Sequence, residues 1–206
     1  MKYLKMLGLA AVAAAALMAL VGAGTASADE LCTEPAVSNM CPAGKQITTI
    51  HASLVGSAVL EDTEGNSIVT CTAGTLHADV TTQGTGVSGV SGPITALTWG
   101  ATGTNCNLPT TTITNGTLDG SAAAGGGTTV KATGTRVTVN TILFGSCVYG
   151  PGAAGLDVGA IANGSEHLAI STVVNKQSGS GVCPETTFWT ATFTVTNHNA
   201  VYYISN

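Results

Sequence analysis

Apolar and polar residues alternate along most of the chain after residue 28. The clearest case is segment 188–196, whose apolar positions alternate with threonines and are Trp189, Ala191, Phe193 and Val195. A period of two places successive side chains on opposite faces of a strand. This segment is therefore predicted to be a β-strand with an apolar inner face and a threonine outer face.

Nine further segments show alternation or a short β-rich apolar run, and no window after residue 28 keeps the spacing of an amphipathic helix. They are residues 47–55, 68–72, 75–81, 94–99, 113–118, 136–140, 156–161, 168–174 and 201–204. Turn-forming sequences separate them at 64–66, 91–93, 119–120, 149–152, 163–164 and 178–181. This order predicts an all-β fold of roughly ten strands, an antiparallel β-sandwich or flattened barrel that is Ig-like or jelly-roll-like.

The N-terminal pattern differs from the rest and predicts a secretory signal peptide over residues 1–28. Lys2 and Lys5 precede an apolar run over 6–21, and small residues follow up to the A-x-A sequence at 26–28. The alternative is an uncleaved membrane anchor, but the run is shorter than the ~20 residues of a spanning helix and lacks a basic flank. We expect a mature chain that begins near Asp29 and is secreted, either extracellular or associated with the cell surface.

Two units are expected after the signal. Residues 29–45 contain two cysteines and two prolines without alternation, which predicts an irregular N-terminal strap tied down by a disulfide. Residues 46–206 are predicted to form a single β-sandwich domain, with a flexible loop at 121–129. No segment after the signal is apolar enough for stable membrane insertion, so we expect a soluble domain.

Six cysteines follow the signal, and in an oxidising compartment they are expected to form disulfides. Six cysteines allow fifteen pairings, and the sequence alone does not choose among them. Local spacing suggests Cys32–Cys41, Cys71–Cys106 and Cys147–Cys183. The chain contains no C-x-x-C sequence, so a cysteine metal site is not favoured.

Composition narrows the possible partners. Charged residues make up 8% of the chain, against roughly 25% in ordinary globular proteins. Without the signal, four basic residues remain against eleven acidic ones, a formal net charge of −7. The basic residues are scattered singly and are Lys45, Lys131, Arg136 and Lys176. Because they form no stripe that could neutralise phosphates, nucleic acid and anionic lipid are not expected partners.

The titratable side chains indicate no reaction chemistry. His51 is interpreted as a surface or edge histidine, because no nucleophile elbow accompanies it. His77 and Asp79 share one face of a predicted strand and are interpreted as solvent-facing, with weak cation binding as the alternative. The acidic segment 61–64 lacks the residue order of a calcium loop and is interpreted as a solvated turn. We predict no catalytic residue, no metal ligand and no cofactor.

The two tryptophans allow a binding role. Trp99 ends a predicted strand, and Trp189 lies on a predicted apolar face. Burial in the core is the favoured interpretation for both, but Trp99 is also a possible ligand-binding residue because it could stack on a sugar ring. Acidic residues that converge from separate strands, as in glycoside hydrolases, can be neither shown nor excluded by the sequence.

Several short motifs together resemble a family of small secreted, disulfide-containing bacterial β-proteins of unknown function. They are C-P-A-G at 41–44, V-T-C-T at 69–72, the central Cys106, C-V-Y at 147–149, S-G-S-G-V-C-P at 178–184, W-T-A-T-F at 189–193 and V-Y at 201–202. The likeness spans nearly the whole mature chain. It implies a secreted, disulfide-bonded β-domain and implies no activity.

These observations favour a secreted, non-catalytic domain with a structural, adhesive or interaction role. Its partner is unknown and could be a component of the cell surface or an extracellular polymer. The first alternative is a β-sandwich that binds a carbohydrate or small ligand through Trp99. The second is a secreted hydrolase whose carboxylates converge from different strands.

Overall fold

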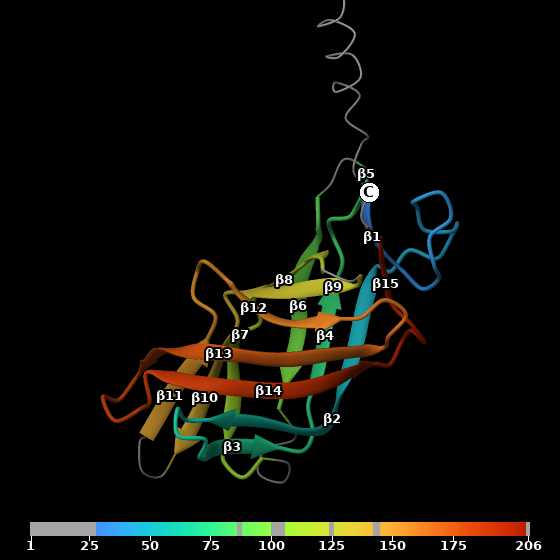
Figure 1. Ribbon diagram of the computed structural model, residues 1–206. Coiled ribbons are helices and arrows are strands. Elements are labelled where there is room, and N and C mark those ends of the chain that lie inside the picture. The colour runs from blue at the N-terminus through green and yellow to red at the C-terminus, as the bar shows by residue number, and fades with distance from the viewer. Residues whose placement is uncertain (1–27, 86–87, 100–105, 124–125, 142–144, 205–206) are drawn as a thin grey trace, which may run out of the picture.

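The computed structural model describes residues 28–85, 88–99, 106–123, 126–141 and 145–204, which form fifteen strands (Figure 1). They are β1 (Ala28–Cys32), β2 (Thr49–Glu61), β3 (Ser67–Cys71), β4 (Thr75–Asp79), β5 (Gly84–Thr85), β6 (Val90–Thr98), β7 (Thr110–Thr114), β8 (Thr117–Ala122), β9 (Thr128–Thr133), β10 (Arg136–Thr141), β11 (Gly145–Gly150), β12 (Leu156–Ile161), β13 (His167–Gly179), β14 (Thr186–Val195) and β15 (Tyr202–Ile204). Within these ranges no helix is long and apolar enough to span a membrane. The all-β class is confirmed, although the strands outnumber the roughly ten expected. Apart from Ala28, the predicted signal peptide lies outside the described residues.

Eight strands form a closed antiparallel barrel. Hydrogen-bonded neighbours follow the order β12-β9-β8-β6-β4-β2-β14-β13, and the pairing of β12 with β13 completes the circuit. Closure leaves these strands without a free edge.

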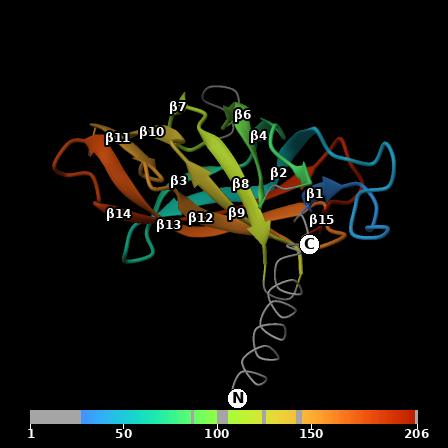
Figure 2. The same cartoon turned by 90° about the horizontal axis from the view of Figure 1, so that it is seen from above.

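Three of the barrel strands continue beyond it into a second curved sheet. The first half of β2 pairs with β4 and its second half with β3, while β13 pairs first with β12 and then with β11. Strands β10 and β7 extend this sheet past β11. We call this part the second lobe: β3, β7, β10, β11 and the adjoining halves of β2, β13 and β14. Figure 2 shows the resulting elongated shape, with β10 and β11 at one end and β1 and β15 at the other.

A β-bulge allows β2 to belong to both the barrel and the second lobe. The register of β2 against β14 shifts between the pairs Thr190–Val59 and Thr192–Val55. Gly56 lies inside this shift with a φ of 71°, a conformation that residues with a Cβ rarely adopt. Because a bulge bends its strand, β2 turns here from the barrel into the second lobe.

The two edges of the second lobe are joined by a disulfide. Cys71 at the end of β3 is bonded to Cys106, and the next residue, Asn107, exchanges hydrogen bonds of 3.0 and 2.8 Å with the backbone of Thr70. Strand β7 starts shortly after, at Thr110. The second lobe therefore curves around an interior of its own.

All six cysteines are paired as their spacing suggested: Cys32–Cys41, Cys71–Cys106 and Cys147–Cys183. The first of these bonds anchors the N-terminal strap. The other two bonds tie strands of the second lobe to connecting segments. Cys71 in β3 is bonded to Cys106, which precedes β7, and Cys147 in β11 is bonded to Cys183, between β13 and β14.

The N-terminal strap is more regular than expected. Residues 28–32 form β1, which pairs with β15 on one side and with β5 on the other in a separate three-stranded sheet. Leu31 and Cys32 are buried there, which explains why the segment is ordered although it shows no alternation. The remainder of the strap, residues 33–45, contains turns and isolated bridges.

Two predicted turns are in fact strand interiors. Gly92 and Pro93 lie within β6, and Gly92 packs so close to the Asp79 carbonyl that a Cβ could not fit. Gly120 lies within β8, where a Cβ would come within 2.7 Å of the Thr128 methyl and 2.8 Å of a Val90 methyl. These glycines therefore serve close approach between neighbouring strands rather than chain reversal.

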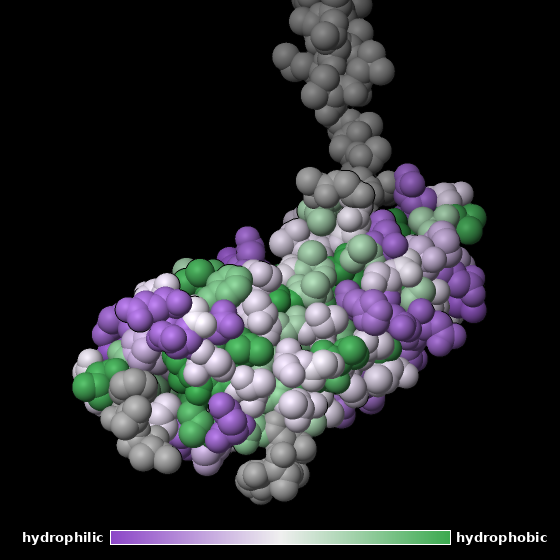
Figure 3. All heavy atoms as spheres, turned by 60° about the horizontal axis from the view of Figure 1, so that its bottom comes forward, coloured by the Kyte–Doolittle hydropathy of each residue, from purple (hydrophilic) through white to green (hydrophobic). Residues whose placement is uncertain are grey.

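The predicted two-faced character of β14 is confirmed. Ala191, Phe193 and Val195 are 5%, 1% and 2% exposed, whereas the intervening threonines face outward. Much of the surface is weakly polar, like the threonine face of β14. On the face in Figure 3 residues of intermediate hydropathy predominate, and hydrophobic residues form separate small patches.

Candidate functional site

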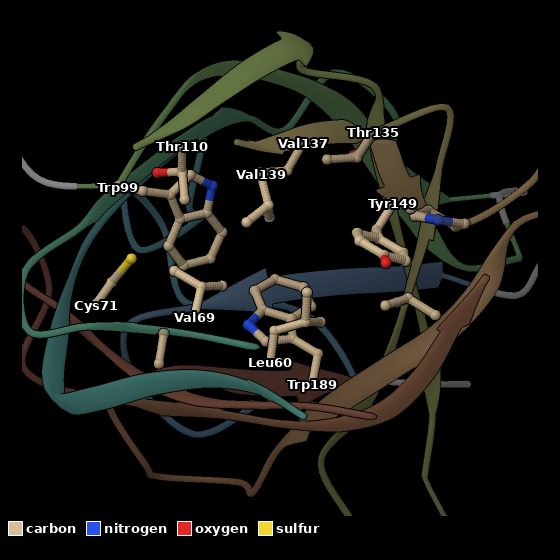
Figure 4. A pocket seen from close by; sticks show the side chains of 14 residues that line it. Leu60, Val69, Cys71, Trp99, Thr110, Thr135, Val137, Val139, Tyr149 and Trp189 are labelled. Carbon is tan, nitrogen blue, oxygen red and sulfur yellow. The ribbon is translucent and has the colours of Figure 1, made fainter. Parts of the chain in front are cut away.

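The second lobe encloses an apolar cavity of about 60 Å³. Its wall is built from β2, β3, β7, β10, β11, β13 and β14 together with Trp99, which follows β6 (Figure 4). The lining residues are Ala58, Leu60, Val69, Cys71, Trp99, Thr110, Thr135, Val137, Val139, Tyr149, Gly150, Pro151, Val174 and Trp189. Trp99 and Tyr149 lie on opposite sides of the cavity, with Val137 and Val139 along one wall and Trp189 along another.

The position of Trp99 is compatible with both interpretations of the sequence, a core residue and a possible ligand-binding residue. It is half-buried and packs edge-on against Trp189, with ring centroids 5.2 Å apart, and against Phe193 at 6.1 Å. These contacts make it a core residue, while its ring also lines the cavity. Its indole Nε1 is buried and has no hydrogen-bond partner among the described residues.

Tyr149 supplies a second polar atom to the same cavity. The residue is 3% exposed, and its hydroxyl also has no partner within the described part of the chain. Burial raises the pKa of Tyr149 to about 12, and the negative charge of Glu185 adds to the rise. The hydroxyl is therefore a neutral donor at physiological pH.

Tyr149 and Tyr203 make stability sensitive to alkaline pH. Burial, followed by the interaction with Asp29, also raises the pKa of Tyr203 to about 12. The folded chain keeps both phenolic protons above pH 10, where the unfolded chain loses them. The free energy of unfolding should therefore fall between about pH 10 and pH 12, while below that range these groups leave it unchanged.

Denaturant unfolding at several alkaline pH values measures this effect. Tyr149→Phe should make the fall between about pH 10 and pH 12 shallower, because one of the two raised pKa values is gone. An equally steep fall in the variant would show that Tyr149 ionises normally in the folded protein.

The barrel holds two further apolar cavities, of about 60 and 40 Å³. Trp189 lines both the cavity of the second lobe and the smaller barrel cavity, so it separates the two spaces. Such voids fit a core built from Ala, Val, Leu and Thr with few aromatic rings. Among the four buried polar atoms without partners in the described ranges, two belong to the second-lobe cavity.

A polar cleft of about 410 Å³ lies on the outside of the barrel. Asp119 in β8 pairs with Lys131 in β9, which in turn pairs with Asp157 in β12. At a strand spacing of about 4.8 Å, the two aspartates have Cα atoms roughly 10 Å apart, with the lysine between them. This alternating row of charges is a common cross-strand arrangement, and the buried Asp29 of β1 lines the same cleft.

The acidic segment 61–64 forms a turn that uses its own carboxylate. Asp62 accepts hydrogen bonds of 2.9 Å from Glu64 N, Asn66 N and Asn66 Nδ2. The Asn66 side chain is the main cause of a lowered Asp62 pKa, with the backbone of Asn66 next. The solvated-turn interpretation agrees with this geometry.

The remaining sequence candidates lie elsewhere. His51 in β2 and His77 in β4 are cross-strand partners with stacked rings, a pairing that their 26-residue separation did not suggest. Glu30 lies beside Cys32 and Cys41, but these sulfurs form a disulfide and are not thiolate ligands.

Comparison of the chain with protein-family models, with curated proteins and with solved structures gives no match in any of the three. The resemblance to secreted bacterial β-proteins therefore stays a prediction.

Proposed function

We propose that this chain is an exported, non-catalytic binding domain that holds a small, mainly apolar molecule in the second-lobe cavity. One observation carries the proposal: two buried hydrogen-bond donors, Trp99 Nε1 and Tyr149 Oη, line a single apolar cavity without a partner among the described residues. Ligand pockets characteristically combine apolar walls with a few polar groups in this way.

The unpartnered donors define the ligand's chemistry. A buried polar group without a hydrogen bond costs about 1–3 kcal/mol, so an acceptor atom in the cavity would be stabilising. Indole nitrogen can only donate, and a neutral tyrosine hydroxyl can donate as well as accept. The ligand is therefore an apolar molecule with at least one carbonyl, ether or ester oxygen. Its size is a few heavy atoms, because the cavity measures about 60 Å³.

Export is supported by the three disulfides, which persist in oxidising compartments, and by the N-terminal sequence pattern. Binding inside the second lobe is preferred to adhesion through the surface because the exposed apolar side chains gather only in small pairs, Val37 with Met40 and Val173 with Phe188. Those in the described ranges are Val37, Met40, Val55, Val173, Val182 and Phe188.

Intrinsic fluorescence provides a direct test. The chain contains two tryptophans, and both line this cavity, so a change in emission reports on it. We expect small ketones, beginning with acetone, to shift the emission, and hydrocarbons of the same size to bind more weakly. Tyr149→Phe removes one donor and should weaken ketone binding by up to about tenfold, with little effect on hydrocarbons.

A second variant separates binding from non-specific effects. Val139→Leu adds one methylene group to the cavity wall and should weaken the binding of all probes, while Thr192→Ala on the outer face should change nothing. If ketones leave the emission unchanged, or bind equally well to Val139→Leu, the cavity is a packing void or holds only water and the proposal is wrong.

A further inference from the structure

Two histidines lie together on the outer face of the barrel and do not line the second-lobe cavity. His51 in β2 lies directly opposite His77 in β4, and their rings stack with centroids 4.3 Å apart and an interplanar angle of 21°. His51 is exposed and His77 is partly exposed, so both rings are accessible to ions in solution.

The backbone beneath His51 is held firmly. Its amide donates to Asn197 Oδ1 at 2.9 Å, and its carbonyl accepts from the amide and hydroxyl of Thr196 at 2.7 and 3.1 Å. On the far side of His77, its cross-strand partner in β6 is Ala96, a small residue. The pair therefore combines a fixed Cα separation with rings that can adjust.

The geometry points to a divalent transition-metal site in which His51 and His77 each supply one imidazole nitrogen and water completes the coordination. Metal–nitrogen bonds of about 2.0–2.1 Å at a tetrahedral ion place the two nitrogens about 3.3 Å apart. In the stacked arrangement the in-plane lone pairs of the two rings run side by side, so both rings must turn about their side-chain bonds for one nitrogen of each to face the same ion. The first choice of metal is Zn²⁺ or Cu²⁺, because these ions prefer imidazole, whereas Ca²⁺ and Mg²⁺ prefer oxygen.

Two properties of the chain suit such a site. Its six cysteines are all in disulfides, so no thiolate competes with the imidazoles for the ion. The acidic mature chain would also attract cations, since eleven acidic residues face four basic ones after residue 28.

Zn²⁺ titration of the intact, disulfide-bonded protein tests the site. In NMR spectra of the imidazoles, Zn²⁺ should shift the His51 and His77 resonances at concentrations that leave His167 unchanged, and Ca²⁺ should shift neither pair member. By calorimetry, His51→Gln and His77→Gln should each lower the Zn²⁺ affinity by at least about tenfold. Thermal unfolding with Zn²⁺ should occur at a higher temperature in the wild type and at an unchanged temperature in both variants.

His167→Ala is the matched control. This histidine is also exposed and hydrogen-bonds Thr194 at 2.8 Å, but no aromatic or histidine ring of the described residues stacks on it. The variant should bind Zn²⁺ like the wild type. Wild-type affinity in His77→Gln, a loss of affinity in His167→Ala, or no Zn²⁺-dependent shift of the pair would each overturn the proposal. Metal-free unfolding of the variants shows whether any loss reflects misfolding instead of a missing ligand.

Discussion

Replacing Cys147 and Cys183 together with serine is expected to lower the free energy of unfolding by about 4 kcal/mol. The bond closes a loop of 36 residues and so removes much of the conformational freedom of the unfolded chain. Both cysteines are buried, at 1% and 3% exposure, so the serine hydroxyls would add a desolvation cost. Since domains are stable by about 5–15 kcal/mol, the loss is a large share of the total.

Urea unfolding of the oxidised protein measures this loss. The internal comparison is Cys32 and Cys41, whose bond spans only nine residues and should contribute about 3 kcal/mol. A Cys147/Cys183 double alanine variant separates the loop effect from the buried hydroxyls. A loss below about 1 kcal/mol in the alanine variant would mean that the bond does not restrict the unfolded chain as the loop-entropy argument requires.

Several strands with one buried face could be predicted from the sequence, although β9, which also alternates, was not among them and begins inside the predicted loop 121–129. In β4 and β14 the alternation of apolar and polar residues placed the strand to within two residues, because one face of each strand is buried and the other faces solvent. Strand β11 was missed for the opposite reason. Its last four residues, 147–150, are all buried, so it shows no alternation.

The candidate sites depend on long-range pairing, which the sequence does not display. Trp99 follows β6 and Tyr149 lies in β11. They line the same cavity only because β2, β13 and β14 extend from the barrel into the second lobe. The position of Trp99 at the end of a predicted strand suggested it as a possible binding residue, but nothing in the sequence indicated Tyr149. Likewise, His51 and His77 become neighbours because β2 pairs directly with β4, although β3 lies between these two strands in the sequence.

Phe193→Ala is expected to cost about 3–5 kcal/mol, the other large effect on stability. Phe193 is 1% exposed and is the largest of the fully buried side chains in the described ranges. It lies in β14 between the strands shared by both parts of the fold, and it packs edge-on against Trp99. Its removal would open a cavity next to existing voids in a core with few aromatic rings, so little neighbouring mass is available to fill it.

Thr192→Ala, one position earlier, should cost less than about 1 kcal/mol, because its side chain faces outward between Val55 and Ala169. Trp189→Ala should fall between the two, since Trp189 is only partly buried and already borders a cavity. Denaturant unfolding of the three variants tests the register of β14 directly. A one-residue shift in register would exchange the buried and exposed faces, so a larger loss for Thr192 than for Phe193 would show that the strand is inverted relative to the core.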